Sequence, residues 1–294
     1  MSDSDIYTRI QDTRQRGPAK RLVLCADDYA LNEPVSDAIL TLLAYGRISV
    51  TSCMTGSPLW PAHGERLRAA GMAGRAGLHF NLTEPFPGSI SVPLGRLMLL
   101  CRSGLMDARI ALAALQRQLD DYEDVMQTPP AFVDGHQHVH VFSGLRDMLL
   151  DELARRYSER PWIRVLSPLS RPYPADKAAA LWLMGATRTE ARLHAEGWRY
   201  NHGFGGLYAL QPAAGFAEQM PGWLRQTANQ GLIMCHPATA AAPGDAIGPA
   251  RAVEYAWFKS EALPAALKAA HAILVDAPDG EPVPPARIEL RVAH

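Results

Sequence analysis

The side chains of this sequence best suited to chemistry are acidic and imidazole groups in three short blocks. They are Asp27 and Asp28 in LVLCADDYALN, His79 in GLHFNLT, and His136, His138 and His140 in FVDGHQHVH. Each block follows an apolar run typical of a buried strand, and strand ends are where α/β folds present reactive groups. Two imidazoles and a carboxylate brought together there would form a site for a divalent metal ion with open coordination positions.

The first block offers two carboxylates with different environments. In an extended chain, neighbouring side chains point to opposite faces, so we expect one of Asp27 and Asp28 to face a metal ion and the other a substrate. Two carboxylates this close push their pKa values apart, which suits one as a ligand and the other as a proton acceptor. The structural alternative is a helix start, in which an aspartate or Asn32 caps the helix that follows.

The second block alternates between apolar and polar residues. This alternation predicts that His79 and Asn81 share one face of a strand, and we take His79 as a candidate metal ligand and Asn81 as a candidate substrate contact. The alternative is that His79 is a core or rim residue, because a single histidine in an apolar strand usually has its hydrogen bonds satisfied by the protein and binds no metal.

The third block places histidines at every second position. If the segment is extended, the side chains of His136, His138 and His140 lie on one face, about 6.5 Å apart along the strand. That spacing predicts that one imidazole binds the ion and that the others orient it or contact the substrate. Because Phe132 and Val133 lead in from a buried strand, we favour this interpretation over a histidine-rich surface loop.

Two further residues stand at strand ends. His236 closes the apolar run GLIMCHPA, and Arg164 is the charged residue in WIRVLS. A histidine beside a metal ion could protonate a leaving group, and a buried arginine is usually paired, for which a catalytic aspartate would be a suitable partner. The alternatives are a buried histidine bonded to the backbone and a structural ion pair elsewhere. The chain has no nucleophile elbow, phosphate-binding loop or dinucleotide fingerprint after a strand.

Composition narrows the class of protein. The chain has 294 residues, a formal net charge of −1 and 48% hydrophobic residues, which suits one (β/α) barrel over residues 21–294 after a flexible arm over residues 1–20. Near-neutral charge gives no electrostatic case for a nucleic-acid partner or an anionic membrane, and no stretch reaches the roughly 18 apolar residues of a membrane span. Four cysteines without a CxxC pair predict reduced thiols and a cytoplasmic setting.

The elements that must position these groups alternate between strand and helix, the pattern of a parallel sheet covered by helices. We expect strands over residues 21–28, 48–55, 76–83, 131–140, 162–167, 231–238 and 271–275. We expect helices over residues 33–45, 61–70, 108–126, 143–157, 174–196, 216–229 and 254–267. We expect residues 85–105 to form a long excursion that acts as a lid or substrate loop. We expect the glycine-rich stretches 203–206 and 243–248 to be flexible loops.

Taken together, the blocks resemble the motifs of YdjC-type carbohydrate deacetylases, also called the ChbG/HpnK family. ADDYALN resembles the family's ADD(F/Y)G block, GLHFNLT its H-x-x-L-T block and FVDGHQHVH its D-x-H-x-H-x-H block. The late CHP and the run from Arg251 to Leu263 resemble its C-terminal signature, so the likeness covers about residues 20–272. One departure is Ala30, where the family usually has glycine.

The resemblance implies a fold and a metal site. The fold is a deformed (β/α) barrel of the polysaccharide-deacetylase-like type. One divalent ion would be held by Asp28, His79 and His136. Magnesium or zinc suits such a donor set best, and cobalt, nickel and manganese also fit.

The resemblance also implies a reaction, the removal of an acetyl group from an N-acetylated sugar. The substrate would be a chito-oligosaccharide or a glycoconjugate or glycolipid containing N-acetylglucosamine, and the family favours a homodimer. Asp27 would be the general base, Arg164 would hold it ionised, and His236 would protonate the departing amine. The rival functions are a non-catalytic sugar-binding barrel and a different metal-dependent amidohydrolase, whose sites commonly open with an H-x-H block that ADDYA does not offer.

Overall fold

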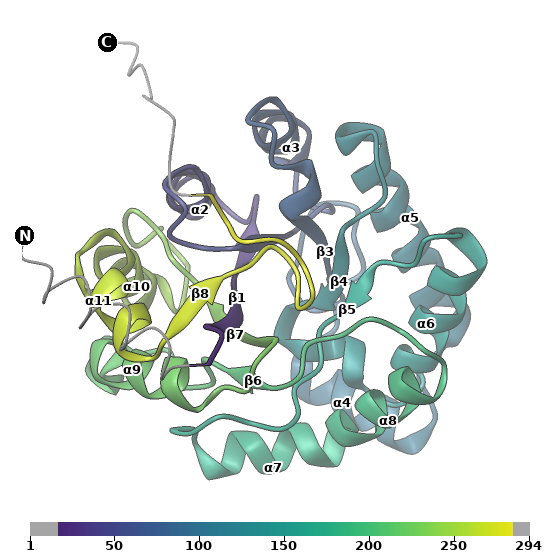
Figure 1. Cartoon of the computed structure of the whole chain (residues 1–294). Helices are drawn as coiled ribbons and strands as arrows, with labels where there is room; N and C mark the ends of the chain where they lie inside the picture. The colour runs from purple at the N-terminus through teal and green to yellow at the C-terminus, as the bar shows by residue number, and fades with distance from the viewer. Residues whose placement is uncertain (1–16, 285–294) are drawn as a thin grey trace, which may run out of the picture.

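A curled sheet of parallel strands lies at the centre of the molecule (Figure 1), for which the computed structural model describes residues 17–284. The strands are β1 (Lys20–Tyr29), β2 (Val50–Cys53), β3 (Ala76–Phe80), β4 (Phe132–Gly135), β5 (Trp162–Ile163), β6 (Phe204–Gly205), β7 (Gly231–Cys235) and β8 (Ala272–Leu274). Their order is β5-β4-β3-β2-β1-β7-β6, and β8 pairs with the first residues of β1. Isolated parallel bridges, Ile163 with Tyr200 and Leu169 with Phe204, bring the two ends of the sheet together. The predicted α/β class with a deformed barrel is confirmed.

Strand β1 lies in the interior of the sheet, between β2 and β7. Its residues from Leu22 to Ala26 are completely buried and pair with β7. Parallel strands covered on both faces need apolar side chains at successive positions. Leu22 and Leu24 therefore pack into one hydrophobic cluster, and Val23 and Cys25 into another on the opposite face. Such a strand holds the groups at its carboxyl end in a rigid setting.

Helices surround the sheet (Figure 1). They are α2 (Glu33–Ala44), α3 (Trp60–Ala69), α4 (Leu94–Ser103), α5 (Ala108–Met126), α6 (Leu145–Arg156), α7 (Ala175–Met184), α8 (Ala186–Ala195), α9 (Phe216–Gln226), α10 (Gly248–Lys259) and α11 (Ala262–Ala269). The predicted bounds of α5 are confirmed. Asn32 caps α2, because its side chain accepts a hydrogen bond of 3.0 Å from the Val35 amide.

Several expected elements differ in the structure. The helix expected over residues 174–196 is divided into α7 and α8 at Gly185, whose φ of 115° is left-handed. The helix expected over residues 254–267 is likewise two helices, α10 and α11, and α10 begins earlier, at Gly248. The excursion over residues 85–105 contains α4. The expected arm falls mainly on residues 1–16, outside the described residues, while Lys20 already belongs to β1.

The glycine-rich stretch 203–206 is a strand and not a flexible loop. It contains β6, which pairs with β7 at Phe204 and Gly205. A Cβ atom at Gly206 would collide with the Met234 backbone, so this glycine permits close packing of two backbones. A strand of two residues is too short to show a period in the sequence, which explains why the prediction was wrong.

Among the residues that the structure describes, no helix combines the length and apolar character that crossing a bilayer requires.

Candidate active site

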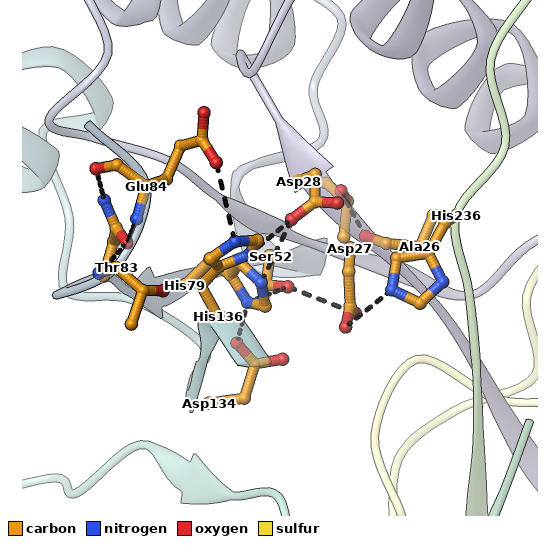
Figure 2. A network of polar contacts seen from close by, with 12 residues as sticks. Ala26, Asp27, Asp28, Ser52, His79, Thr83, Glu84, Asp134, His136 and His236 are labelled. Carbon is orange, nitrogen blue, oxygen red and sulfur yellow. Dashed lines mark hydrogen bonds and ion pairs between the residues drawn. The ribbon is translucent and has the colours of Figure 1, made fainter. Parts of the chain in front are cut away.

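The predicted site residues meet where several parallel strands end. Asp27 and Asp28 lie at the end of β1, His79 in β3, His136 just after β4 and His236 just after β7. Figure 2 shows their side chains pointing toward one another. All five residues line one cavity of about 690 Å³. Groups from the three sequence blocks thus share one space, as their positions at strand ends predicted.

Asp28 is the centre of the candidate metal site. Its Oδ1 atom lies 3.2 Å from Nε2 of His79 and 3.1 Å from Nδ1 of His136. One potential ligand atom from each of these three residues lies within 4.8 Å of the others. A carboxylate oxygen and two imidazole nitrogens at this separation are a donor set that zinc or a similar divalent ion accepts. The residues present therefore fit the predicted ion.

His79 is oriented by the groups behind it. Its Nδ1 atom lies 2.6 Å from Oδ1 of Asp134 and 3.0 Å from Oγ of Ser52 (Figure 2). A carboxylate on the far nitrogen is how proteins usually orient a metal-binding histidine, since it leaves Nε2 free for the ion. Burial alone would lower the pKa of His79, but Asp134 and Asp28 raise it to about 10. The surrounding carboxylates therefore favour a positive charge at this point, which a metal ion would supply.

Asp27 is held by a buried arginine. Arg164 is fully buried, and its Nη1 and Nη2 atoms lie 2.7 and 2.5 Å from the two oxygens of Asp27. Arg164 also contacts Asp134 at 2.5 Å. Burial would raise the pKa of Asp27, but the Arg164 guanidinium outweighs it and holds that pKa well below its usual range. The predicted contact of Arg164 with an aspartate is confirmed, and Asp27 is ionised at neutral pH.

His236 faces Asp27 across the cavity. Its Nε2 atom lies 3.9 Å from Oδ2 of Asp27 (Figure 2), and its Nδ1 atom has no hydrogen-bond partner within the described part of the chain. Burial lowers the pKa of His236 to about 4. The resting imidazole is therefore neutral, and it must receive a proton before it can donate one to a leaving group.

The two aspartates do not face opposite sides, so that expectation was wrong. The pairing of β1 with β2 is irregular between Ala26 and Tyr29, and Asp28 has a φ of 73°. This left-handed residue breaks the alternation of an extended chain and turns both carboxylates into the same cavity. Ala30 is also left-handed, with a φ of 71°. A glycine adopts this conformation without strain, which explains why the family usually has one there.

The histidine block is not extended, which corrects a second expectation. Residues His136–Val141 form a 3₁₀ segment in which Gln137 and His138 have φ values of 51° and 63°. His138 still lines the cavity, with its ring edge-on to Phe204. His140 instead lies behind the site, where its Nε2 atom is 3.0 Å from the carbonyl oxygen of Arg164. Of the two, His138 alone is placed to contact a substrate.

Asn81 stabilises a loop and does not line the cavity. Its side-chain oxygen accepts hydrogen bonds from the amides of Thr83 and Glu84, at 2.9 and 2.8 Å. Its side-chain amide donates to the Glu84 carbonyl at 2.9 Å. β3 ends at Phe80, so the alternation that placed Asn81 beside His79 does not continue. The substrate contact predicted for Asn81 is absent from this geometry.

Arg251 and Glu254, in the run that resembles the family's C-terminal signature, support the site, a role that the sequence did not predict for them. Arg251, on α10, donates to Oδ2 of Asp28 at 2.7 Å and lies 2.8 Å from Asp245. Glu254, one turn further along α10, accepts hydrogen bonds at 2.5 Å from the His236 amide and the Tyr208 hydroxyl. Burial raises the pKa of Glu254 to about 7. Helix α10 thus supports both Asp28 and His236, although more than 200 residues separate it from Asp28.

We predict that Arg251→Met lowers the free energy of unfolding by about 3 kcal/mol, because it leaves two carboxylates of the site without their buried cation. Arg251 is 2% exposed. The matched control is Arg199→Met, which removes an exposed ion pair with Asp279 and should change stability by less than about 1 kcal/mol. Chemical unfolding of both variants checks this. Equal losses in the two would show that the Arg251 contact contributes no more than a surface pair.

The sequence model of a family described as "YdjC-like protein" matches residues 21–269. The chain belongs to this family. The match includes every residue of the candidate site, and the resemblance inferred from the sequence motifs is confirmed.

Relatives of this YdjC-like chain have names that refer to sugars. It is 26% identical over 235 residues to a chitooligosaccharide deacetylase of Yersinia pestis (strain Pestoides F), which covers 74% of this chain and 82% of the relative. It is 28% and 27% identical over 155 residues to carbohydrate deacetylases of Mus musculus and Homo sapiens. Those two matches span 48% and 46% of the mouse and human proteins, about half of their length.

A solved structure shares the fold. A putative cellobiose-phosphate cleavage protein from Enterococcus faecalis V583 superposes with a TM-score of 0.63 over 87% of this chain and 97% of its own. The sequences are 18% identical, so this likeness concerns the architecture of the YdjC-like sheet and its helices alone.

Proposed function

We propose that this chain is a metal-dependent deacetylase of N-acetylated sugars. The observation that carries the proposal is the convergence of Asp28, His79 and His136 beside an ionised Asp27 in one cavity. The names of its relatives, carbohydrate deacetylase and chitooligosaccharide deacetylase, support the same reaction. Asp28, His79 and His136 would hold one divalent ion, with magnesium or zinc as the first candidates.

A divalent ion at these three residues would polarise the acetyl carbonyl and lower the pKa of a water molecule beside it. Asp27 would then accept a proton from that water. Its low pKa keeps the carboxylate ionised and also makes it a weak base, so it can act only on an acidified water. Arg164 keeps both Asp27 oxygens in place through its paired contacts.

His236 would deliver a proton to the departing amine. Since its pKa of about 4 keeps it neutral at rest, the proton must reach it during the reaction. The nearest carboxylate oxygen that could supply it is Oδ2 of Asp27, 3.9 Å from Nε2. Glu254 fixes the backbone of His236 and so holds the ring at this separation.

The side chains that line the cavity indicate which substrates it favours. Leu94 and Met98 of α4 and Leu181 and Met184 of α7 line it, together with Phe142. A volume of about 690 Å³ lies within the usual range for small-molecule sites. These apolar walls favour an N-acetylated sugar that carries an apolar group, such as a glycolipid, over a bare chito-oligosaccharide.

A screen by mass spectrometry tests the proposal. Chito-oligosaccharides and N-acetylglucosamine glycolipids would be incubated with metal-loaded protein, and the loss of one acetyl group would be measured. We expect that loss from at least one substrate, with a glycolipid preferred, and no loss with metal-depleted protein. If the loaded protein leaves every N-acetyl group intact, the proposed activity is wrong.

The cysteines support a reducing compartment. Cys25, Cys53, Cys101 and Cys235 are all buried, and none of them forms a disulfide. We therefore place the protein in the cytoplasm as part of this proposal. The homodimer favoured by the resemblance stays a prediction.

A further inference from the structure

Large apolar side chains are exposed on and beside two neighbouring helices. Leu99 on α4 is 66% exposed and Leu105, just after it, 73%. Trp182 and Leu183, near the end of α7, are 67% and 53% exposed. Figure 1 shows α4, α7 and α8 at the same end of the molecule. Arg102 of α4 lines one small cavity with Trp182 and Leu183 of α7, so the two helices are neighbours here, and clustered exposed apolar residues mark an interaction surface. We call these four residues the α4–α7 patch.

Arginines lie directly beside the patch. A second cavity, of about 240 Å³, is lined by Arg102, Arg146 and Arg188 together with Trp182 and Leu183. Its lining residues include no acid. Within residues 17–284, Arg102 and Arg188 are exposed and form no ion pair with a carboxylate. Arg102 is three residues after Leu99, which places both on one face of α4.

The start of α8 adds a second, independent signal for an anion. Arg146 is 8% exposed; its Nε and Nη2 atoms pair with Asp147 at 2.8 and 3.0 Å, while its Nη1 atom has no hydrogen-bond partner among the described residues. That atom lies beside Gly185, the residue before α8, and no side chain caps this helix. The free amides at a helix start and the unpartnered Nη1 atom of Arg146 both offer hydrogen bonds to a negative group such as a phosphate.

The same two helices line the catalytic cavity with their other sides. Leu94 and Met98 of α4 and Leu181 and Met184 of α7 face the cavity that holds Asp28. A surface that covers the α4–α7 patch would therefore lie next to the cavity walls.

We infer that the α4–α7 patch docks the protein on an anionic lipid surface. Arg102 and Arg188 bind headgroup phosphates, and Trp182 with its apolar neighbours enters the boundary between headgroups and acyl chains. Tryptophan favours that boundary because it combines a large apolar ring with a polar N–H group. Basic residues near such a surface add attraction to anionic lipids. A second copy of the chain is a poorer occupant, since a two-fold contact would place the same arginines opposite each other.

Co-sedimentation with vesicles tests this inference without measuring catalysis. The inference can therefore fail while the proposed deacetylase activity holds, and the activity can fail while the inference holds. Full-length protein would be mixed with vesicles of phosphatidylcholine alone or with added phosphatidylglycerol. We expect binding to the anionic vesicles alone, weakening as salt is added. Arg102→Gln with Arg188→Gln should lower the bound fraction at least about tenfold. Trp182→Ala with Leu183→Ala should also lower it.

A matched double variant is Tyr45→Ala with Arg47→Gln, which removes an exposed aromatic residue and an arginine at the end of α2. It should bind vesicles as the unchanged protein does. Equal binding to neutral and anionic vesicles would overturn the inference, as would no binding to either. So would binding of free inorganic phosphate that leaves the vesicles unoccupied. If the Trp182 and Leu183 substitutions split a dimer in solution and leave vesicle binding unchanged, the patch is an interface between copies and the inference is wrong.

Discussion

Asp27→Asn is expected to lower acetate release by about 10²- to 10⁴-fold, the usual contribution of a general base, while the protein still binds its metal ion. Asparagine has the size of aspartate but cannot accept the proton. Asp28, His79 and His136 are unchanged in this variant, and Arg164 keeps its contact with Asp134 at 2.5 Å. The measurement is acetate release at saturating substrate, with metal content determined on the same sample.

The control for this variant is Asp37→Asn, the same change at an exposed aspartate of α2 that pairs with Arg66. It should leave both acetate release and metal content unchanged. If Asp27→Asn keeps full turnover, then another residue is the base. If the variant loses the metal together with turnover, Asp27 is a metal ligand, and the assignment of different roles to Asp27 and Asp28 is wrong.

The second large effect is expected from the metal ligands. Asp28→Ala, His79→Ala and His136→Ala should each reduce bound metal from about one ion per chain toward none and abolish acetate release. Each substitution removes one of the three protein donors, which leaves too few to retain a divalent ion. Metal analysis after dialysis measures the first effect, and an acetate assay measures the second.

His202→Ala is the matched control, because His202 is exposed and lies outside the catalytic cavity. It should retain metal and activity. Full metal occupancy in all three ligand variants would contradict the assignment of these residues. If His79→Ala is the only one of the three variants that loses metal, His79 is the only ligand among these residues, and the ion must have other ligands.

The strand ends of the site could be predicted because apolar runs determine them locally. β1 and β7 are buried on both faces, so their sequences are continuous apolar runs followed directly by Asp27 and His236. The same reasoning predicted that Arg164, a charge in an apolar run, would need a carboxylate partner. These inferences depend on burial and charge, which a single sequence displays.

The backbone at the ends of the strands could not be predicted in the same way. Left-handed residues at Asp28, Gln137 and His138 redirect the side chains that follow, and none of them is a glycine. An assumption of regular alternation therefore placed His140 on the wrong side of the site, and it placed Asn81 at the substrate although β3 ends at Phe80. Tertiary contacts hold these turns, and local sequence carries little sign of them.

The run from Arg251 to Leu263 was recognised as a motif, but its contacts with the site could not be predicted. Arg251 and Glu254 are buried polar residues on an amphipathic helix far along the chain, and only the fold brings them to Asp28 and His236. Asp134 could have been recognised from the sequence, since it lies at the end of β4 two residues before His136. A carboxylate in that position is a natural partner for a metal-binding histidine.

The central claim is that one divalent ion held by Asp28, His79 and His136 enables the removal of an acetyl group from a sugar. Its most direct test is to deplete the protein of metal, restore the ion in steps and follow acetate release from an N-acetylated sugar against bound metal. The account predicts that release rises in proportion to occupancy and levels off at about one ion per chain, and that Asp28→Ala shows neither. Full acetate release by metal-depleted protein would contradict it.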